Sequence, residues 1–203
     1  MATGEMTTLE AALRRAVDIL RAERLRWAII GGLAVSARCE PRTTRDIDVA
    51  VAVSADEEAE RILFRLQGHG LVVVSTVEQT ARKRLATARL RGSDGALRLV
   101  LLDLLFASSG IEREVVATAE EIEVLPGLSV PVARTGYLIA LKALARNDRY
   151  RPQDLDDVRS LLRDAAPEDL DEARRAAALI EFRGFARGRS LSEELETLLR
   201  GEV

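Results

Sequence analysis

The sequence predicts an α/β protein of the α+β kind, in which a mixed sheet flanked by helices precedes a helical C-terminal part. Three observations lead to this fold class. Short apolar runs in the first half end at glycine or begin at aspartate, alternating segments typical of strands fill the middle, and apolar residues recur at helical period after Thr135. We therefore expect a core domain at residues 1–133 and a helical part at residues 134–203.

Capping and periodicity predict the helices. Thr7 and Glu10 have the spacing of a capping box, and apolar residues follow at helical period as far as Glu23. Ser54 and Glu57 have the same spacing and begin a second helix, which glycines end at 68 and 70. A further helix can start after the glycine pair at 31 and 32, and the later helices are expected at residues 137–146, 154–163, 168–182 and 191–200.

The strands are predicted from short apolar or alternating runs bounded by turn residues. The expected strands cover residues 27–30, 46–53, 71–74, 84–91 and 97–106, and the "GSDG" stretch at 92–95 joins the last two as a hairpin. A weaker pair at 121–125 and 129–133 flanks the turn at 126–128.

Composition limits the chemistry that the chain can perform. One cysteine, Cys39, excludes an internal disulfide, and one histidine, His69, excludes a metal site built from histidines. Any metal ion must then be held by carboxylates, which favour Mg²⁺ or Mn²⁺. The net charge of −3 gives no global attraction for nucleic acid. With no apolar run of membrane-spanning length and no secretory leader, we expect a cytoplasmic protein without a membrane partner.

The aspartates of the "DIDVAVAV" run are the strongest candidates for a metal site. In a strand, Asp46 and Asp48 lie on one face, about 6 to 7 Å apart along the chain, while Ile47 points to the other face. Asp103 interrupts an apolar strand, where an unpaired charge costs several kcal/mol, and it becomes a third ligand if the two strands are neighbours. The alternatives are that the first two acids are solvated and that Asp103 bonds a loop amide.

The glycine pair after the first apolar run is a candidate phosphate site. Gly31 and Gly32 open a predicted helix, so backbone N–H groups and the positive helix end can meet a phosphate. A tight turn without a ligand explains the same residues. Ser36 lies in the same helix and either contacts the nucleotide or faces solvent.

These motifs resemble the nucleotidyltransferase superfamily with the DNA polymerase β-like fold, and most closely its AbiEii-type members, including the MenT-like toxins. The resemblance rests on "GG", a spacer of thirteen residues and "DID", with Ala34, Arg42 and Thr44 matching the family's pattern between them. It continues with "LLDLL" around Asp103 and with "LIALKALARNDRYRPQDLDDV". Relatives often have a small hydroxyl residue where this chain has Leu33, so one phosphate contact is missing.

The resemblance implies magnesium-dependent or manganese-dependent transfer of a nucleoside monophosphate from a nucleoside triphosphate to an acceptor hydroxyl. An attack on the α-phosphate releases pyrophosphate. The implied metal ligands are Asp46, Asp48 and Asp103, and Lys142 completes the catalytic set. The implied nucleotide contacts are Gly31, Gly32, Ser36, Arg42, Thr44, Lys142 and Arg146, and Asp154 and Asp157 are implied to orient Lys142 or an arginine.

The resemblance also favours an RNA acceptor, with the 3′ end of tRNA as the leading candidate, and a toxin with an antitoxin as a candidate partner. The arginines expected at the RNA entrance are Arg38, Arg42, Arg45, Arg149 and Arg151, although arginines at such positions more often form a solvated face. Three other functions stay open: transfer to a small molecule of the antibiotic type, transfer to a protein hydroxyl, and non-catalytic nucleotide binding. The sequence fixes neither the base nor the oligomeric state.

Overall fold

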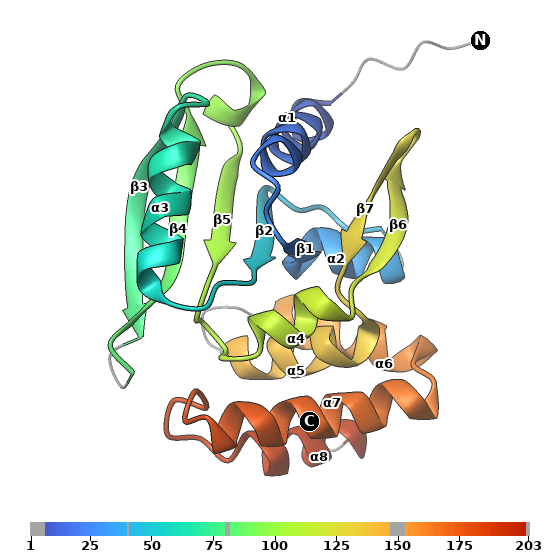
Figure 1. Ribbon diagram of the computed structural model, residues 1–203. Coiled ribbons are helices and arrows are strands. Elements are labelled where there is room, and N and C mark those ends of the chain that lie inside the picture. The colour runs from blue at the N-terminus through green and yellow to red at the C-terminus, as the bar shows by residue number, and fades with distance from the viewer. Residues whose placement is uncertain (1–6, 40, 80–81, 147–152, 202–203) are drawn as a thin grey trace, which may run out of the picture.

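The computed structural model describes residues 7–39, 41–79, 82–146 and 153–201 and contains one seven-stranded mixed sheet with helices on both faces. Figure 1 shows α1 and α3 on the near side of the sheet and the later helices gathered below it. The predicted fold class is confirmed. Within the described ranges, no helix is both long enough and apolar enough to cross a bilayer.

The elements follow the sequence in an order that places strands first and helices last. The strands are β1 (Trp27–Ile30), β2 (Asp46–Val51), β3 (Leu71–Gln79), β4 (Arg84–Gly92), β5 (Leu101–Leu105), β6 (Glu120–Leu125) and β7 (Leu128–Val132). The helices are α1 (Thr8–Ala22), α2 (Gly31–Arg38), α3 (Asp56–Gln67), α4 (Glu112–Ala117), α5 (Thr135–Ala145), α6 (Gln153–Asp164), α7 (Pro167–Phe182) and α8 (Leu191–Leu199), with a short 3₁₀ helix at Ala96–Arg98.

The sheet order β3-β4-β5-β2-β1-β7-β6 puts β2 near the centre. β2 runs parallel to β5 and antiparallel to β1, so Asp46 lies beside the start of β5, and Asp48 lies beside the middle of β5 and the end of β1. The register pairs Asp48 with Asp103 across β2 and β5 and with Ile30 across β1 and β2. The condition for Asp103 to approach the pair, that the two aspartate-bearing strands are neighbours, is therefore met.

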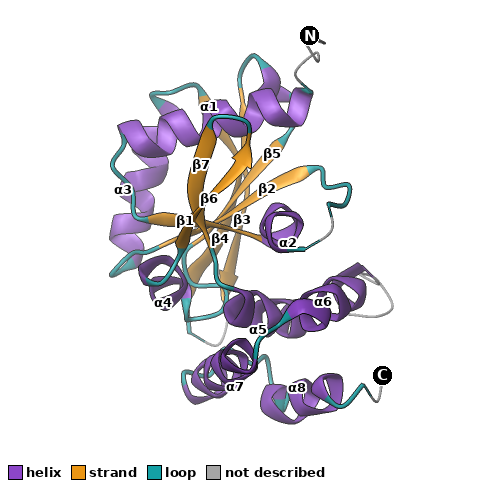
Figure 2. Cartoon of the chain, turned by 90° about the vertical axis from the view of Figure 1, so that its right-hand side faces the viewer, coloured by secondary structure: helices purple, strands orange, loops and turns teal. Residues whose placement is uncertain are grey.

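The helices cover the two faces of the sheet unequally. Figure 2 shows α2 on one side and α3 and α4 on the other, with α5 to α8 beyond one end of the sheet. The buried apolar side chains of both layers and of the later helices form one continuous core, which includes Ile47 of β2, Leu138 of α5 and Ile180 of α7. The buried side chains of β2 pack in this core, so the start of the strand, which carries Asp46 and Asp48, is rigidly placed.

Three predicted details differ from the structure. Ser54 bonds Glu58 rather than Glu57, through both its amide and its hydroxyl at 2.7 Å, and α3 starts at Asp56 without a side-chain cap. The run at 97–106 is a 3₁₀ turn followed by the shorter strand β5, because the chain needs that turn to reverse after β4. Helix α4 was not predicted, since six residues are too few to show helical period.

A substitution of Ile47 tests whether side chains alternate between the two faces of β2, which is what places both aspartates on one face. Its side chain is fully buried, so we expect Ile47→Ala to lower the free energy of unfolding by about 2 to 5 kcal/mol, through lost burial and the cavity left behind. Urea denaturation measures this loss. Phe64→Ala is the control, because Phe64 of α3 is exposed and should change stability by less than about 0.5 kcal/mol. Equal losses in the two variants would contradict the assigned register.

Candidate active site

The candidate site lies where β2 begins and β1 ends. Asp46 and Asp48 are half-buried residues of β2, and the buried Ile47 between them anchors the strand in the core. Because side chains alternate along a strand, both carboxylates lie on the same face. Asp103 of β5 lies in register beside Asp48 and is almost fully buried.

Gly31 makes the close approach between α2 and Asp48 possible. Its φ of +63° is a backbone conformation that L side chains rarely adopt. A Cβ atom at this position would lie 2.0 Å from the Asp48 Oδ2 atom and 2.6 Å from its Cγ atom. The first residue of α2 is therefore glycine for two independent reasons, its backbone conformation and the carboxylate that lies against it.

Asp103 is compensated by an arginine from the neighbouring strand. The Nε and Nη2 atoms of Arg89 donate hydrogen bonds of 2.8 and 2.7 Å to the two carboxylate oxygens of Asp103. These bonds raise the pKa of the Arg89 guanidinium above its usual value, and the charges of Asp46 and Asp48 act in the same direction. The register explains the pairing, because Arg89 of β4 lies directly opposite Asp103.

The carboxylates of β2 have the chemistry that a hard divalent cation requires. A Cβ atom of any other residue at position 31 would overlap the Asp48 Oδ2 atom, so the glycine leaves this carboxylate its place at the start of α2. The residues present thus fit a cation held by Asp46 and Asp48. Among the described residues, no three acids, histidines or cysteines form a group that could hold a metal, and Asp103 is bonded to Arg89 instead.

A second charged cluster connects the glycine turn with the helices that follow the sheet. The Nζ atom of Lys142 in α5 lies 2.9 Å from Asp154 Oδ1 and 2.8 Å from Asp157 Oδ2, both in α6. Arg42 also donates to Asp157, at 2.7 Å. Both carboxylates are buried, so two cations and two anions balance one another in a region that excludes most water.

Gly32 places this cluster beside the start of α2. A Cβ atom on Gly32 would lie 2.8 Å from the Arg42 Nη2 atom and 2.8 Å from the Thr44 Oγ1 atom. Arg42 therefore lies against the glycine turn on one side and Asp157 on the other. Through Arg42, the turn, β2 and α6 form one connected set of contacts.

Ser36 and Thr44 have structural contacts with their own loop. The Ser36 hydroxyl accepts a bond of 3.3 Å from the Arg42 amide and lies 3.4 Å from the Arg42 carbonyl oxygen. It therefore fixes the backbone of Arg42 against α2. The Thr44 hydroxyl lies 3.5 Å from the carbonyl oxygen of Asp46. Both residues order the segment between α2 and β2, and their predicted contact with a nucleotide stays a prediction.

The predicted arginines do not form one group. Arg38 is bonded to Glu120 at 2.7 Å and to the carbonyl oxygens of Val132 and Ala133, so it ties α2 to β6 and β7. Arg45 is exposed just before β2, and Arg146 ends α5. The remaining two predicted arginines, Arg149 and Arg151, lie outside the described residues.

Sequence reasoning missed Arg89, the residue in most direct contact with Asp103. The strand from Arg84 to Gly92 carries three arginines, at positions 84, 89 and 91, and which of them faces Asp103 stays open until the register is known. The signal that was available is the buried charge of Asp103 itself, which requires a cation nearby.

Comparison with protein-family models matches residues 12–202 to the family described as nucleotidyl transferase AbiEii toxin, type IV TA system. A search of curated proteins found no match. Among solved structures, an antigenic nucleotidyltransferase-like protein from Paracoccidioides brasiliensis is 21% identical, with a TM-score of 0.50 and coverage of 97% of this chain and 94% of that chain. At this identity the likeness concerns the fold alone.

Two further solved structures are similar. The antibiotic-resistance factor ANT(2'')-Ia is 19% identical, with a TM-score of 0.48 and coverage of 94% of this chain and 89% of that chain. A putative nucleotidyltransferase from H. pylori is 12% identical, with a TM-score of 0.47 and coverage of 99% and 97%. The family match spans nearly the whole chain and includes both glycines, every aspartate of the site and Lys142. The chain therefore belongs to the AbiEii nucleotidyltransferase toxin family and is an enzyme of the nucleotidyltransferase kind.

Proposed function

We propose that this chain transfers a nucleoside monophosphate from a nucleoside triphosphate to a hydroxyl of an RNA acceptor, the 3′ end of tRNA, and that it acts as the toxin of a toxin–antitoxin pair. The observation that carries the transferase site is the contact of Gly31 with Asp48 beside Asp46. Membership of a toxin family supports the biological role. The RNA acceptor and the antitoxin are proposals that rest on the sequence resemblance.

The residues of the site have distinct roles in this proposal. Asp46 and Asp48 hold a Mg²⁺ or Mn²⁺ ion, and the chemistry that this ion supplies when bound is stabilisation of charge on the transferred phosphate. The backbone amides of Gly31 and Gly32 orient the remaining phosphates, a role that the contact of Gly31 with Asp48 supports because no side chain separates that turn from the carboxylate. Asp103 joins the ligand set when it is released from Arg89.

Lys142 and Arg42 provide the positive charge of the site. Both are held by aspartates, Lys142 by Asp154 and Asp157 and Arg42 by Asp157. A triphosphate that reaches them must replace part of those ion pairs, so the aspartates fix the position of the cations and also weaken their contact with other anions. We assign Asp154 and Asp157 to orientation of Lys142 and Arg42 rather than to the reaction.

Asp48→Asn tests the transferase assignment. Loss of the carboxylate should abolish transfer of α-labelled nucleotide to RNA, while the melting temperature stays near that of the wild type or rises, because two neighbouring acids repel. Each α-labelled nucleoside triphosphate is incubated with Mg²⁺ and total cellular RNA and protein, and the labelled product is identified. Asp18→Asn, a change of an exposed acid in α1, is the control and should transfer nucleotide like the wild type.

The outcomes of this assay separate the alternatives. Label in a tRNA-sized band with the wild type but not with Asp48→Asn supports the proposal. Label in protein would show that the acceptor is a protein hydroxyl instead. Full activity of Asp48→Asn would refute the site. Nucleotide binding without release of pyrophosphate, whatever the acceptor, would indicate a binding protein of the same fold.

Arg89→Met tests the compensation of Asp103. The variant leaves a buried carboxylate without its bidentate partner, and because Arg89 is partly exposed we expect a loss of about 1 to 3 kcal/mol in the free energy of unfolding. Mn²⁺ should raise the melting temperature of this variant more than that of the wild type, since Asp103 becomes available to a cation. Arg91→Met, two residues along the same strand and exposed, is the matched control. Identical stability and Mn²⁺ response in the two variants would contradict the role of Arg89.

A further inference from the structure

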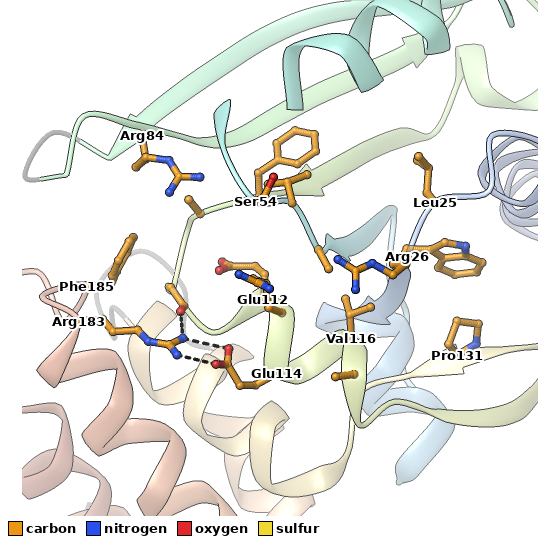
Figure 3. A pocket seen from close by; sticks show the side chains of 18 of the residues that line it. Leu25, Arg26, Ser54, Arg84, Glu112, Glu114, Val116, Pro131, Arg183 and Phe185 are labelled. Atoms are coloured by element: carbon orange, nitrogen blue, oxygen red, sulfur yellow. Dashed lines mark hydrogen bonds and ion pairs between the residues drawn. The ribbon is translucent and has the colours of Figure 1, made fainter. Parts of the chain in front are cut away.

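A large open cleft lies at the end of the central strands opposite to the candidate active site. Its volume is about 1190 Å³. It is lined by residues that precede β1, follow β2 and β5, form α4 and end α7. Figure 3 shows Arg26, Ser54, Arg84 and Arg183 around it. Val53, which lines the cleft, follows Asp48 by five residues of extended chain. At about 3.3 Å per residue, the cleft therefore begins about 16 Å from the carboxylates.

The cleft has an excess of positive charge in a protein whose net charge is −3. Three acids, Glu112, Glu114 and Glu121, line it together with the arginines Arg21, Arg26, Arg82, Arg84, Arg113 and Arg183. Two of the arginines are neutralised locally, Arg84 by Asp56 at 2.5 Å and Arg183 by Glu114 at 2.6 Å. Figure 3 shows the second pair at the edge of the cleft.

Three other arginines of the cleft are available to a ligand. Arg26, Arg82 and Arg113 are exposed, and within the described part of the chain none of them forms a hydrogen bond or an ion pair. Buried Glu112 does not offset them by direct contact, because its Oε1 atom accepts bonds from the Ser108 and Ser109 amides at 2.8 and 2.7 Å. The cleft thus presents three guanidinium groups from separate segments, the turns before β1 and β4 and helix α4, and Glu58 and Glu114 act on Arg26 and Arg113 only through space.

Aromatic side chains lie at the same cleft. Phe182, the last residue of α7, is 84% exposed, which is unusual for so large an apolar side chain. Phe185 is buried and packs against Gly110, where a Cβ atom would lie 2.5 Å from its ring. Gly184, with φ of +76°, admits the guanidinium of Arg82, whose Nη2 atom would lie 2.1 Å from a Cβ atom there. Gly110 and Gly184 therefore make room for the Phe185 ring and the Arg82 guanidinium, and Phe182 lines the same cleft.

We propose that this cleft binds a single-stranded segment of the RNA acceptor, with Arg26, Arg82 and Arg113 on its phosphates and Phe182 stacked on a base. Sequence-tolerant binding of single strands combines such cations with an exposed aromatic platform, and a base is free to stack on a side chain only where it is unpaired. The proposal rests on the proposed function in one respect, namely that the bound RNA is the acceptor.

The test compares two triple variants that remove the same charge. Arg26→Gln, Arg82→Gln and Arg113→Gln are combined in one variant, and Arg15→Gln, Arg61→Gln and Arg175→Gln, which are exposed and outside the cleft, in the other. Fluorescence anisotropy measures the affinity for a labelled single-stranded RNA of about 12 nucleotides over a range of salt concentration. We expect the cleft variant to bind at least tenfold more weakly and to lower the salt slope by about 2, and the control to change by less than twofold.

Phe182→Ala supplies an independent readout. Its side chain is exposed, so its removal costs little stability. We expect affinity for the same RNA to fall about fivefold or more with an unchanged salt slope, because stacking does not release counterions. Equal weakening by the two triple variants would overturn the proposal, as would binding of polyglutamate or of duplex RNA to the cleft as tightly as of the single strand.

Calorimetry with a nucleoside triphosphate and Mg²⁺ separates this inference from the proposed function. Both triple variants should bind nucleotide like the wild type, since the carboxylates of β2 are untouched. If the wild type binds RNA through the cleft but labels no RNA, the transferase proposal fails and the cleft assignment stands. If RNA is labelled and the cleft variant equals the control in both binding and labelling, only the cleft assignment fails.

Discussion

The close contact between Gly31 and Asp48 is the constraint around which the site is built. Any side chain at position 31 would overlap the carboxylate, and the positive φ of this residue lets β1 turn directly into α2. The start of α2 is thereby fixed against the start of β2, and the core beneath Ile47 keeps that edge of the sheet in place. Backbone amides and carboxylates are brought together without an intervening side chain, which is the arrangement that phosphate and a divalent cation need.

The other buried aspartates of the site are compensated by cations in two separate places. Asp103 is balanced by Arg89 across two strands, and Asp154 and Asp157 are balanced by Lys142 and Arg42 across two helices and a loop. Buried charges of this kind are expensive unless they are paired. The pairing also limits the site, because cations and carboxylates that hold one another must be released before they can serve a substrate.

The sequence was sufficient for the fold class and for the aspartate candidates, because alternation and buried acids are local patterns, whereas the neighbouring positions of β2 and β5 came from the sheet order. It was not sufficient for Arg89, since which of the three arginines of β4 faces Asp103 depends on a register that no local pattern determines. Helix α4 is too short to show periodicity, and the bond from Ser54 to Glu58 differs from the predicted one by a single residue. The cleft arises from segments far apart in the chain, so only the folded structure brings its arginines and Phe182 together.

The most direct test of the site is the stoichiometry and affinity of Mn²⁺, measured by electron paramagnetic resonance with a non-hydrolysable nucleoside triphosphate. The wild type should bind nucleotide only with the cation, and Asp46→Asn should weaken cation binding at least tenfold because it removes a carboxylate ligand. Asp171→Asn, an exposed acid of α7, should bind Mn²⁺ like the wild type. If Asp46→Asn retained the Mn²⁺ affinity of the wild type, the cation would not lie at the start of β2 and the account would be wrong.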